Sequence, residues 1–497
     1  MMLKRMLIGG AALALAATIS GVVALRRVPA DPALWSTDVT EFPLALFADA
    51  RTRRAFLVTT PLVTTPLGAS GTHVTVIDLD TGRALRTVTA GWGVSSDAPA
   101  ALDRRTARLV VATTTSARAA SGGAAPTFAG RVTVLDTRSG AVVRAWALGV
   151  APQDIVVDEA IGHAFVVSAG LDGTGMGLVG MLDTHSGRLL RTSVVDIPAW
   201  NETTVDVTAR RVYVPVYVPA FARASSARVS ILDARSGAVE RSVALGAAAP
   251  VSVAATGLGS ILVSSYGGVR LIDPRPGRPV PPIPIQAPAG DARIGVDTPL
   301  HRAVIVTVAR ATLLDLDRGA AIGSVRDAQP ASTPAFDDHS GHLFVLVQPM
   351  TAAYVPIGRG SVTMLDTRHG TVLGTAAVGV DPVAVTVDAA RGRVLVLNHG
   401  TTRRGSPALT DGSVSVLDAR TGTLRATIPV GADPVALAVD DRTGRVIVVT
   451  GPTTVLTPDP WGWLPPWIRQ HLPFVPGAAT LLRPVPTTVR ALDPTRQ

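Results

Sequence analysis

One short pattern recurs nine times along the chain and constrains its fold more than any other feature. It is an apolar-x-apolar-apolar-Asp segment followed by a turn that ends in Gly, as in VTVLDTRSG at 132–140 and VSVLDARTG at 414–422. The copies are roughly 40 to 58 residues apart until a last gap of about 75, and the ninth copy, VRALDPTR at 489–496, is truncated. The aspartates that anchor them are Asp78, Asp136, Asp183, Asp233, Asp273, Asp315, Asp366, Asp418 and Asp493.

A second pattern precedes the first one in the units. It is an alternating apolar run that ends in Asp, a short turn and another apolar run, most clearly at 382–398 and 434–450. A fourth apolar run follows the Asp-to-Gly turn, as in TLRATIPVG at 423–431. Runs of β-branched residues separated by Gly, Asp and Pro are typical of strands. Each unit therefore predicts four strands joined by a tight turn, a loop and a tight turn, which is a blade of a β-propeller.

The number of blades follows from the number of copies. Eight complete units and a partial ninth favour an all-β propeller of eight four-stranded blades over 43–497, with the remnant packed on the ring or closing it. Seven and nine blades are the alternatives. A Trp-rich insertion at 452–487 interrupts the last unit.

The repeated Asp and Gly have a local physical reason. An Asp side chain at the head of a turn accepts hydrogen bonds from backbone N–H groups two residues further on. The Gly supplies the positive φ that a hairpin with a bulge requires. Nine carboxylates placed identically in every unit therefore indicate turn chemistry and not an array of metal ligands.

The units resemble the YVTN-type repeats of surface-layer and periplasmic propellers. The matching segments are VDAARGRVLVLNHG from Val387, VSVLDARTGTLRATIPVG from Val414 and DPVALAVD from Asp433, and the resemblance extends over 43–451. It implies a secreted or cell-surface propeller whose function is either unknown or binding. The chain departs from the usual members of that family in its number of units and in the length of its repeats.

The N-terminus predicts a segment that interacts with a membrane. Lys4 and Arg5 precede an uncharged stretch from Met6 to Leu25, which Arg26 and Arg27 follow. As a helix, about twenty residues would span the hydrocarbon core of a bilayer, about 30 Å. A signal peptide usually has a shorter apolar region, although 22–24 is an acceptable cleavage site. We expect 1–27 to be an apolar helix that is either a membrane anchor or a cleaved signal peptide, and 28–42 to be a linker. Both alternatives place the rest in the cell envelope, outside the cytoplasmic membrane, either anchored or secreted.

Charge and composition exclude several function classes. The formal net charge is +9, but Lys4 is the only lysine and most arginines stand singly in turns, which argues against nucleic-acid binding. The absence of cysteine excludes disulfides and thiolate metal sites. The sequence has no nucleophile elbow, P-loop or dinucleotide fingerprint, and His339 and His342 lack a third ligand. We therefore expect no catalytic residue, no metal and no cofactor.

The loops between the second and third strands predict a binding face. They are long and vary in length, and in an up-and-down blade they share one face with the connections between blades. Insertions on one face usually mark the binding face. The alternative is tolerated drift, because loops lengthen at little cost. The loops span 59–73, 113–131, 168–177, 215–228, 348–361 and 398–413.

Two groups of side chains are candidate binding residues. Carboxylates precede or begin the innermost strands, which line the central channel, and they could ring its mouth and hold a cation or a cationic ligand. The alternative is that the Asp-Pro pairs only start turns. These carboxylates are Asp97, Asp154, Glu202, Asp291, Asp381 and Asp433. The second group, Trp461, Trp463 and Trp467, predicts either a plug over the propeller or a contact with a membrane interface or a partner.

Two functions fit these patterns. The first is a non-catalytic propeller outside the cytoplasmic membrane that binds a protein partner, a glycan or a small ligand through its long loops. The second is an enzyme with its site at the channel mouth, lactonase-like or quinone-dependent. An enzyme needs an acid–base or metal constellation in one place, and uniform repeats with few polar outliers favour the first function.

Overall fold

The computed structural model describes most of the chain from residue 33 onward. The described ranges are 33–39, 41–60, 71–92, 98–117, 127–148, 151–169, 176–198, 203–218, 226–246, 250–265, 268–273, 282–283, 293–307, 310–328, 334–350, 357–400, 412–431, 433–451, 454–456, 482–484 and 487–495. The apolar helix expected at 1–27 lies outside these ranges. Within them, no helix is long and apolar enough to cross a bilayer.

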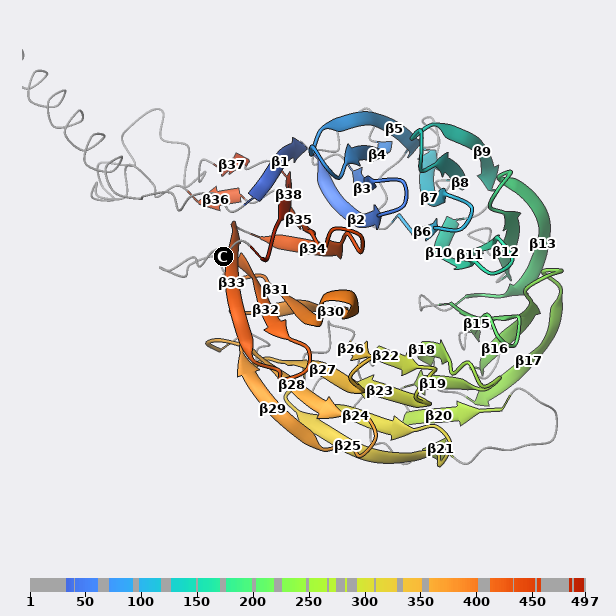
Figure 1. Ribbon diagram of the computed structural model, residues 1–497. Helices are drawn as coiled ribbons and strands as arrows, with labels where there is room; N and C mark the ends of the chain where they lie inside the picture. Colours follow the sequence, from blue (N-terminus) through green and yellow to red (C-terminus); the bar gives the residue numbers. More distant parts are fainter. Residues whose placement is uncertain are drawn as a thin grey trace, which may run out of the picture. The chain divides into compact units, whose positions relative to one another are not determined.

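Nine four-stranded sheets follow one another along the chain and form a β-propeller, shown in Figure 1. Blade 1 consists of β2 (Phe42–Asp49), β3 (Arg54–Thr60), β4 (Gly71–Asp78) and β5 (Ala84–Trp92), and blade 2 of β6 (Ala100–Asp103), β7 (Arg108–Ala117), β8 (Thr127–Asp136) and β9 (Val142–Leu148). Blade 3 consists of β10 (Ala151–Asp158), β11 (His163–Ala169), β12 (Met176–Asp183) and β13 (Arg188–Asp196). Blade 4 consists of β14 (Thr204–Asp206), β15 (Arg211–Val218), β16 (Ser226–Asp233) and β17 (Val239–Gly246). Blades 5 to 8 are β18 (Pro250–Ala255), β19 (Ile261–Ser265), β20 (Gly268–Ile272) and β21 (Pro282–Ile283); β22 (Arg293–Asp297), β23 (Arg302–Val306), β24 (Arg310–Asp315) and β25 (Ala320–Arg326); β26 (Ala335–Asp337), β27 (His342–Val347), β28 (Ser361–Asp366) and β29 (Val372–Ala377); β30 (Pro382–Asp388), β31 (Arg393–Asn398), β32 (Gly412–Asp418) and β33 (Leu424–Gly431), with the 3-10 helix η1 (Ala389–Arg391) between β30 and β31.

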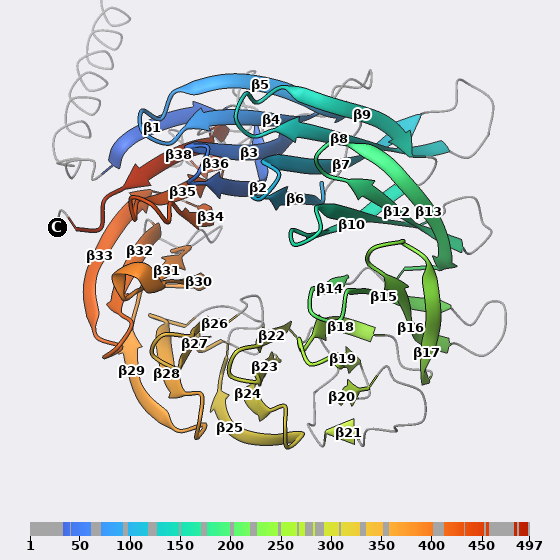
Figure 2. The same cartoon turned by 45° about the vertical axis from the view of Figure 1, so that its right-hand side comes forward.

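The ninth blade is built from both ends of the described chain. Its strands are β34 (Pro434–Val439), β35 (Val446–Thr450), β38 (Thr487–Leu492) and β1 (Ala33–Val39), in that order from the inside outward. Figure 2 shows β1 beside β38 on the outer side of the ring. The truncated ninth repeat therefore supplies a third strand. The fourth strand comes from within 28–42, the range expected to be a linker, and the propeller has nine blades, the upper alternative of the sequence analysis.

The two ends of each blade differ in their connections. One end, here called the turn face, carries the short turns between the first and second strands and between the third and fourth strands. The opposite end, the loop face, carries the second-to-third connections and the links from blade to blade. A small sheet of β36 (Thr454–Leu456) and β37 (Leu482–Pro484) lies within the predicted Trp-rich insertion.

The Asp-to-Gly turns have the predicted hydrogen bonds. In blade 2, Asp136 Oδ1 accepts from the backbone N–H groups of Arg138, at 3.0 Å, and Ser139, at 2.8 Å. The backbone N–H of Gly140 donates to the carbonyl oxygen of Asp136 at 2.8 Å, and Gly140 has a φ of 68°. A β-bulge follows Val134, where β8 shifts its register against β9. This turn is therefore a bulged hairpin, as the sequence predicts.

The core lies between neighbouring blades, as sheets that stack face to face require. One cluster joins blade 1 to blade 2 and includes Phe56, Val76, Leu109 and Val111. All four side chains are almost completely buried. Because these residues come from the second and third strands, which have both faces covered, those strands read as continuous apolar runs in the sequence.

Polar links supplement the apolar contacts between blades. In five blades the first residue of the second strand, and in blade 9 the residue just before it, is an arginine or a histidine whose ring or guanidinium N–H donates to a backbone carbonyl in a turn of the next blade. The donor–acceptor pairs are Arg108–His185, His163–Ala234, Arg302–Thr367, His342–Ala419, Arg393–Gly444 and Arg445–Leu79. These arginines and histidines, at or just before the start of the second strands, therefore link neighbouring blades.

Candidate functional site

Three of the six predicted channel-mouth carboxylates lie in the described part of the chain: Asp154, Asp381 and Asp433. Asp97, Glu202 and Asp291 lie outside it, and so do Trp461, Trp463 and Trp467. The structure therefore shows the surroundings of only three of the six carboxylates in the predicted ring.

Asp381 and Asp433 occupy equivalent positions on the loop face of blades 8 and 9. Each directly precedes the proline that begins an innermost strand, and both have a positive φ, 52° and 54°. Aspartate tolerates this left-handed conformation better than most residues. The carbonyl oxygen of Asp381 accepts from the backbone N–H of His399 at 2.8 Å, and that of Asp433 accepts from Gly451 at 2.7 Å. The carbonyl groups of Asp381 and Asp433 thus hold the loop-face ends of the first two strands together, and the alternative that the Asp-Pro pairs only start turns stays a prediction.

His399 brings the two carboxylates together. Its Nδ1 is 3.5 Å from Asp381 Oδ2, and its Nε2 is in a short contact with Asp433 Oδ1. The three side chains are each only about a quarter exposed, at 22% to 25%. His399 immediately follows β31, so blade 8 contributes Asp381 and the histidine, and blade 9 contributes Asp433. The sequence analysis did not select His399, because its role depends on a carboxylate 34 positions away.

The cluster shifts the protonation of its members. The hydrogen bond with Asp433 raises the pKa of His399; burial opposes this rise, and the charges of Asp433 and Asp381 add to it. Burial raises the pKa of Asp381, against the attraction of His399. The protonated imidazolium of His399 is therefore favoured between the two blades. With both ring nitrogens directed at carboxylates, it has no lone pair to offer to a metal.

Asp154 links a different pair of blades. Its Oδ1 accepts from the backbone N–H of Ile155 at 2.8 Å, and its Oδ2 accepts from that of Thr203 at 2.6 Å. Thr203 directly precedes β14, so the carboxylate joins blade 3 to the entry of blade 4. In blade 7, Gln348 Oε1 similarly accepts from the backbone N–H of Asp381 at 3.2 Å. At these positions the polar side chains link successive blades. The ring of carboxylates around the mouth of the central channel remains a prediction.

The described residues contain no group of three or more His, Cys, Asp or Glu side chains arranged to hold a metal ion. The Asp381–His399–Asp433 cluster can hold and transfer a proton on the loop face. It can also present carboxylate oxygens to a cationic group. Within the described ranges, Asp381 and Asp433 are the only two predicted site residues that contact the same side chain, that of His399.

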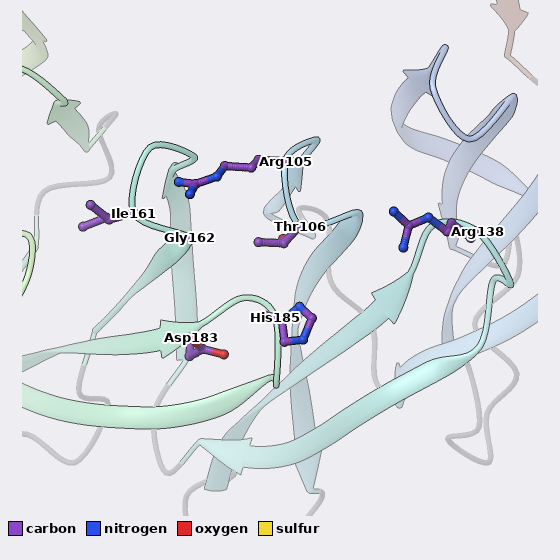
Figure 3. Close-up of a pocket in the computed structure, with 7 residues that line it drawn as sticks. All are labelled: Arg105, Thr106, Arg138, Ile161, Gly162, Asp183 and His185. Atoms are coloured by element: carbon purple, nitrogen blue, oxygen red, sulfur yellow. The ribbon is translucent and has the colours of Figure 1, made fainter.

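A pocket of about 310 Å³ lies on the turn face between blades 2 and 3, as Figure 3 shows. It is lined by Arg105, Thr106, Arg138, Ile161, Gly162, Asp183 and His185. The sequence analysis selected none of these residues, because the pocket forms only where four turns from two blades meet.

The comparisons show a fold and no family. No family model and no curated protein matches the chain. A solved structure of a eukaryotic initiation factor superposes with a TM-score of 0.52 at 13% identity, over 80% of this chain and 90% of that one. Dihydro-heme d1 dehydrogenase NirN in complex with DHE gives a TM-score of 0.47 at 13% identity, over 82% of each chain. A europium-containing methanol dehydrogenase gives 0.43 at 12% identity, over 92% of each chain. At these identities the likeness shows the propeller fold alone, and the resemblance to YVTN-type repeats stays a prediction.

Proposed function

We propose that the chain is a non-catalytic propeller of the YVTN-repeat type that acts outside the cytoplasmic membrane and binds a protein partner, a glycan or a small ligand through its loop face. The observation that carries the proposal is the contrast between the two faces of the blades. Loops on a rigid scaffold are where binding residues usually lie.

The turn face is nearly constant from blade to blade. Connections such as 79–83, 137–141 and 419–423 differ little in length. Their polar groups are used within the fold, because the anchor aspartates accept backbone N–H groups and the arginines donate to the next blade. Because these hydrogen bonds stabilise the fold, the repeats must keep the residues that form them on the turn face.

The loop face varies strongly. The second-to-third connection spans only 266–267 in blade 5 and 307–309 in blade 6, but 348–360 in blade 7 and 399–411 in blade 8. In repeat proteins, insertions gathered on one face support a binding role for that face. Blades 7 and 8 have the longest of these four connections. The connection of blade 8 begins with His399 of the Asp381–His399–Asp433 cluster, and that of blade 7 begins with Gln348, which accepts from the backbone N–H of Asp381. We therefore propose the loop face of blades 7 to 9 as the binding region.

The cluster also supports a second candidate, an enzyme at the channel mouth. A histidine held between two carboxylates is a recognised general acid–base arrangement. The engagement of both of its nitrogens favours the binding function, because a general base must present one nitrogen to the substrate. His399→Gln tests the second candidate: it removes the activity of an enzyme that uses His399 as its acid or base, whereas binding at the long loops loses at most the part of the affinity that the cluster supplies.

The proposal is tested by ligand-dependent stability. The propeller is screened by thermal shift against divalent cations, quinones, sugars and lactones, since a ligand that binds only the folded state raises Tm. Replacement of 401–411 by a two-residue Asn-Gly turn is expected to abolish the Tm rise. Arg420→Ala, on the turn face of the same blade, is the matched control and should retain it. A Tm rise that survives the loop replacement and is lost in Arg420→Ala would contradict the proposal.

The cellular location is tested separately. In cells that produce the full chain, protease added outside the cytoplasmic membrane should degrade it, while a cytoplasmic marker protein stays intact. Protection of the chain together with that marker would refute the extracytoplasmic assignment.

A further inference from the structure

We propose that the pocket on the turn face between blades 2 and 3 binds a small polyanion, held by Arg105, Arg138 and His185. The proposal concerns the face opposite to the loop face, and it does not depend on the function proposed above. Its basis is the combination of a cavity, two arginines and a histidine on its walls, and an Arg138 guanidinium without a partner among the described residues.

The pocket is formed by four turns. Blade 2 contributes Arg105 and Thr106 from its first turn and Arg138 from its second. Blade 3 contributes Ile161 and Gly162 from its first turn, and Asp183 and His185 from its second. Figure 3 shows the side chains of Arg105, Arg138 and His185 arranged around the same space. A volume of about 310 Å³ is at the lower end of the range for small-molecule pockets.

The charge of the lining is positive. Its single carboxylate, Asp183, accepts from the N–H of Ser186 at 2.7 Å and from the Ser186 hydroxyl at 2.6 Å. Burial alone would raise the pKa of Asp183, but these hydrogen bonds and the nearby His163 and His185 lower it. Asp183 thus serves its own turn. The neighbouring acid Glu159 lies 3.8 Å from Arg104.

In two other blades, an acidic side chain in the second turn pairs with a neighbouring arginine or histidine. The residue two positions after the anchor aspartate is Asp80 in blade 1 and Asp317 in blade 6. Asp80 pairs with Arg53, and Asp317 lies 3.0 Å from His301. In blades 2 and 3 the same position holds Arg138 and His185. Neither of these side chains has a hydrogen bond or ion pair with any residue in the described ranges. Because His185 already interacts with the carboxylate of Asp183, Arg138 is the lining side chain whose charge favours an added anion.

Arg105 is held in place by blade 3. Its guanidinium donates to the carbonyl oxygens of Glu159, at 3.2 Å, and Ala160. A guanidinium has five N–H donors, so this anchoring leaves others for a ligand. Because the side chain is already ordered, less conformational entropy is lost when it binds an anion.

Gly162 forms part of the pocket wall next to Thr106. It has a φ of 71°, and a Cβ added to it would lie 3.4 Å from Thr106 Cγ2. The first turn of blade 3 therefore lines the pocket with backbone and leaves room beside the Thr106 side chain. Guanidinium groups recognise the oxygens of phosphate and carboxylate in a bidentate manner. The ligand class is thus a small molecule that carries two or more phosphate or carboxylate charges.

The test is a titration of the full propeller with inorganic phosphate and, separately, with citrate, by isothermal calorimetry at constant ionic strength. Saturable binding at one site is expected for at least one probe. Arg138→Ala and His185→Ala should each weaken it tenfold or more, and Arg138→Lys should recover only part of the loss. Arg420→Ala removes the same charge at the equivalent position of blade 8 and should change the affinity less than twofold. All three positions are exposed, so circular dichroism should show an unchanged fold.

Three outcomes would overturn the proposal. They are the absence of saturable binding of both probes, an equal loss in Arg138→Ala and Arg420→Ala, and binding that Arg138→Ala and His185→Ala leave intact. The second outcome would show that the anions respond to the overall charge alone. Tight phosphate binding with weak citrate binding would identify a phosphate ligand, and the reverse would identify a carboxylate ligand.

Discussion

The indole Nε1 of Trp35 donates a hydrogen bond to the carbonyl oxygen of Leu79 at 3.1 Å. Trp35 lies on β1, in the ninth blade, and Leu79 lies in the second turn of blade 1. Arg445, on the turn face of blade 9, donates to the same carbonyl at 3.3 Å. Around these bonds, Leu57, Ile77 and residues of β35 and β38 form a buried cluster. The ring is therefore closed by one strand, and its seam is sealed by both apolar and polar contacts.

The seam predicts that Gly82→Ala is unusually destabilising. Gly82 has a φ of 71°, and an added Cβ would overlap the ring of Trp35. Strain at positive φ costs about 1 kcal/mol, and overpacking adds roughly 1 to 3 kcal/mol. Gly319→Ala is the matched control, because Gly319 has a φ of 62° in the equivalent turn and nothing within 4 Å of an added Cβ. Urea unfolding should show a clearly larger loss for Gly82→Ala, and equal losses would mean that β1 is not seated against this turn.

His399 predicts a dependence of stability on pH. Its folded-state pKa is raised above the ordinary 6.5, chiefly by the hydrogen bond with Asp433. A raised folded pKa contributes stability that is fully present below the unfolded pKa and is lost as the pH rises through the folded value. His399→Gln should therefore destabilise the protein most below about pH 6.5 and progressively less at higher pH. The free energy of unfolding, measured between pH 5 and 9, checks this.

A histidine with a different environment serves as the control for this measurement. The side chain of His339 is 80% exposed. The free energy of unfolding of His339→Gln should therefore depend on pH in the same way as that of the wild type. A constant difference between wild type and His399→Gln across the range would show that the imidazolium does not link blades 8 and 9.

The anchor aspartates predict the response to acid. Hydrogen bonds from Thr421, and then from Arg425, lower the pKa of Asp418 to about 2. A lowered folded pKa contributes stability that is present above the unfolded value near 3.8 and is lost as the pH falls through about 2. Asp418→Asn should cost about 1 kcal/mol at pH 6, after allowance for solvent screening. At pH 2 it should cost almost nothing.

The same direction of shift recurs around the ring. The pKa is also lowered at Asp78, Asp136, Asp183, Asp233 and Asp366. Wild-type stability should therefore fall steeply between pH 4 and pH 2. Urea denaturation at half-unit steps of pH would measure both effects, and a flat wild-type profile over this range would contradict the assignment.

Two ion pairs in blade 8 should differ strongly in their contribution to stability. Arg393 and Asp388 are buried, with side chains 5% and 3% exposed, and Arg393 Nη2 lies 2.7 Å from Asp388 Oδ2. Arg393→Ala removes the bonds of Arg393 to Asp388 and to the carbonyl oxygen of Gly444, and it leaves the buried carboxylate with Arg391 alone, at 3.3 Å. The variant should therefore cost about 3 kcal/mol. Arg425, 51% exposed, pairs with Asp418, and Arg425→Ala should cost at most about 1 kcal/mol. Denaturant unfolding of the two variants compares them, and similar losses would exclude a special role for Arg393.

The repeat made most of the fold predictable. In the seven described turns that run from an anchor aspartate to a Gly, such as the one after Asp136, the aspartate ends a third strand and the Gly has a positive φ. These features depend on neighbours within four residues, which sequence patterns report directly.

The ninth blade was harder to predict, because its strands are far apart in the sequence. The segment ALWSTDV of β1 is an outer strand with partly exposed residues, so it has no continuous apolar run. It also lacks the Asp-to-Gly turn that joins a third strand to a fourth. The site was harder still, since neither the His399–Asp433 contact nor the pocket at Arg105 and His185 follows from any local pattern.

The ninth blade has a consequence for biosynthesis. Thr488 on β38 donates to Asp38 on β1 at 3.1 Å, although 450 positions separate the two residues. A nascent chain can complete eight blades one after another, each from local contacts, while β1 waits without a partner. Contacts between such distant segments form slowly, and a waiting strand presents a free edge to other chains. We expect newly made molecules to be most prone to aggregation in this interval, before β38 is available and the ring can close.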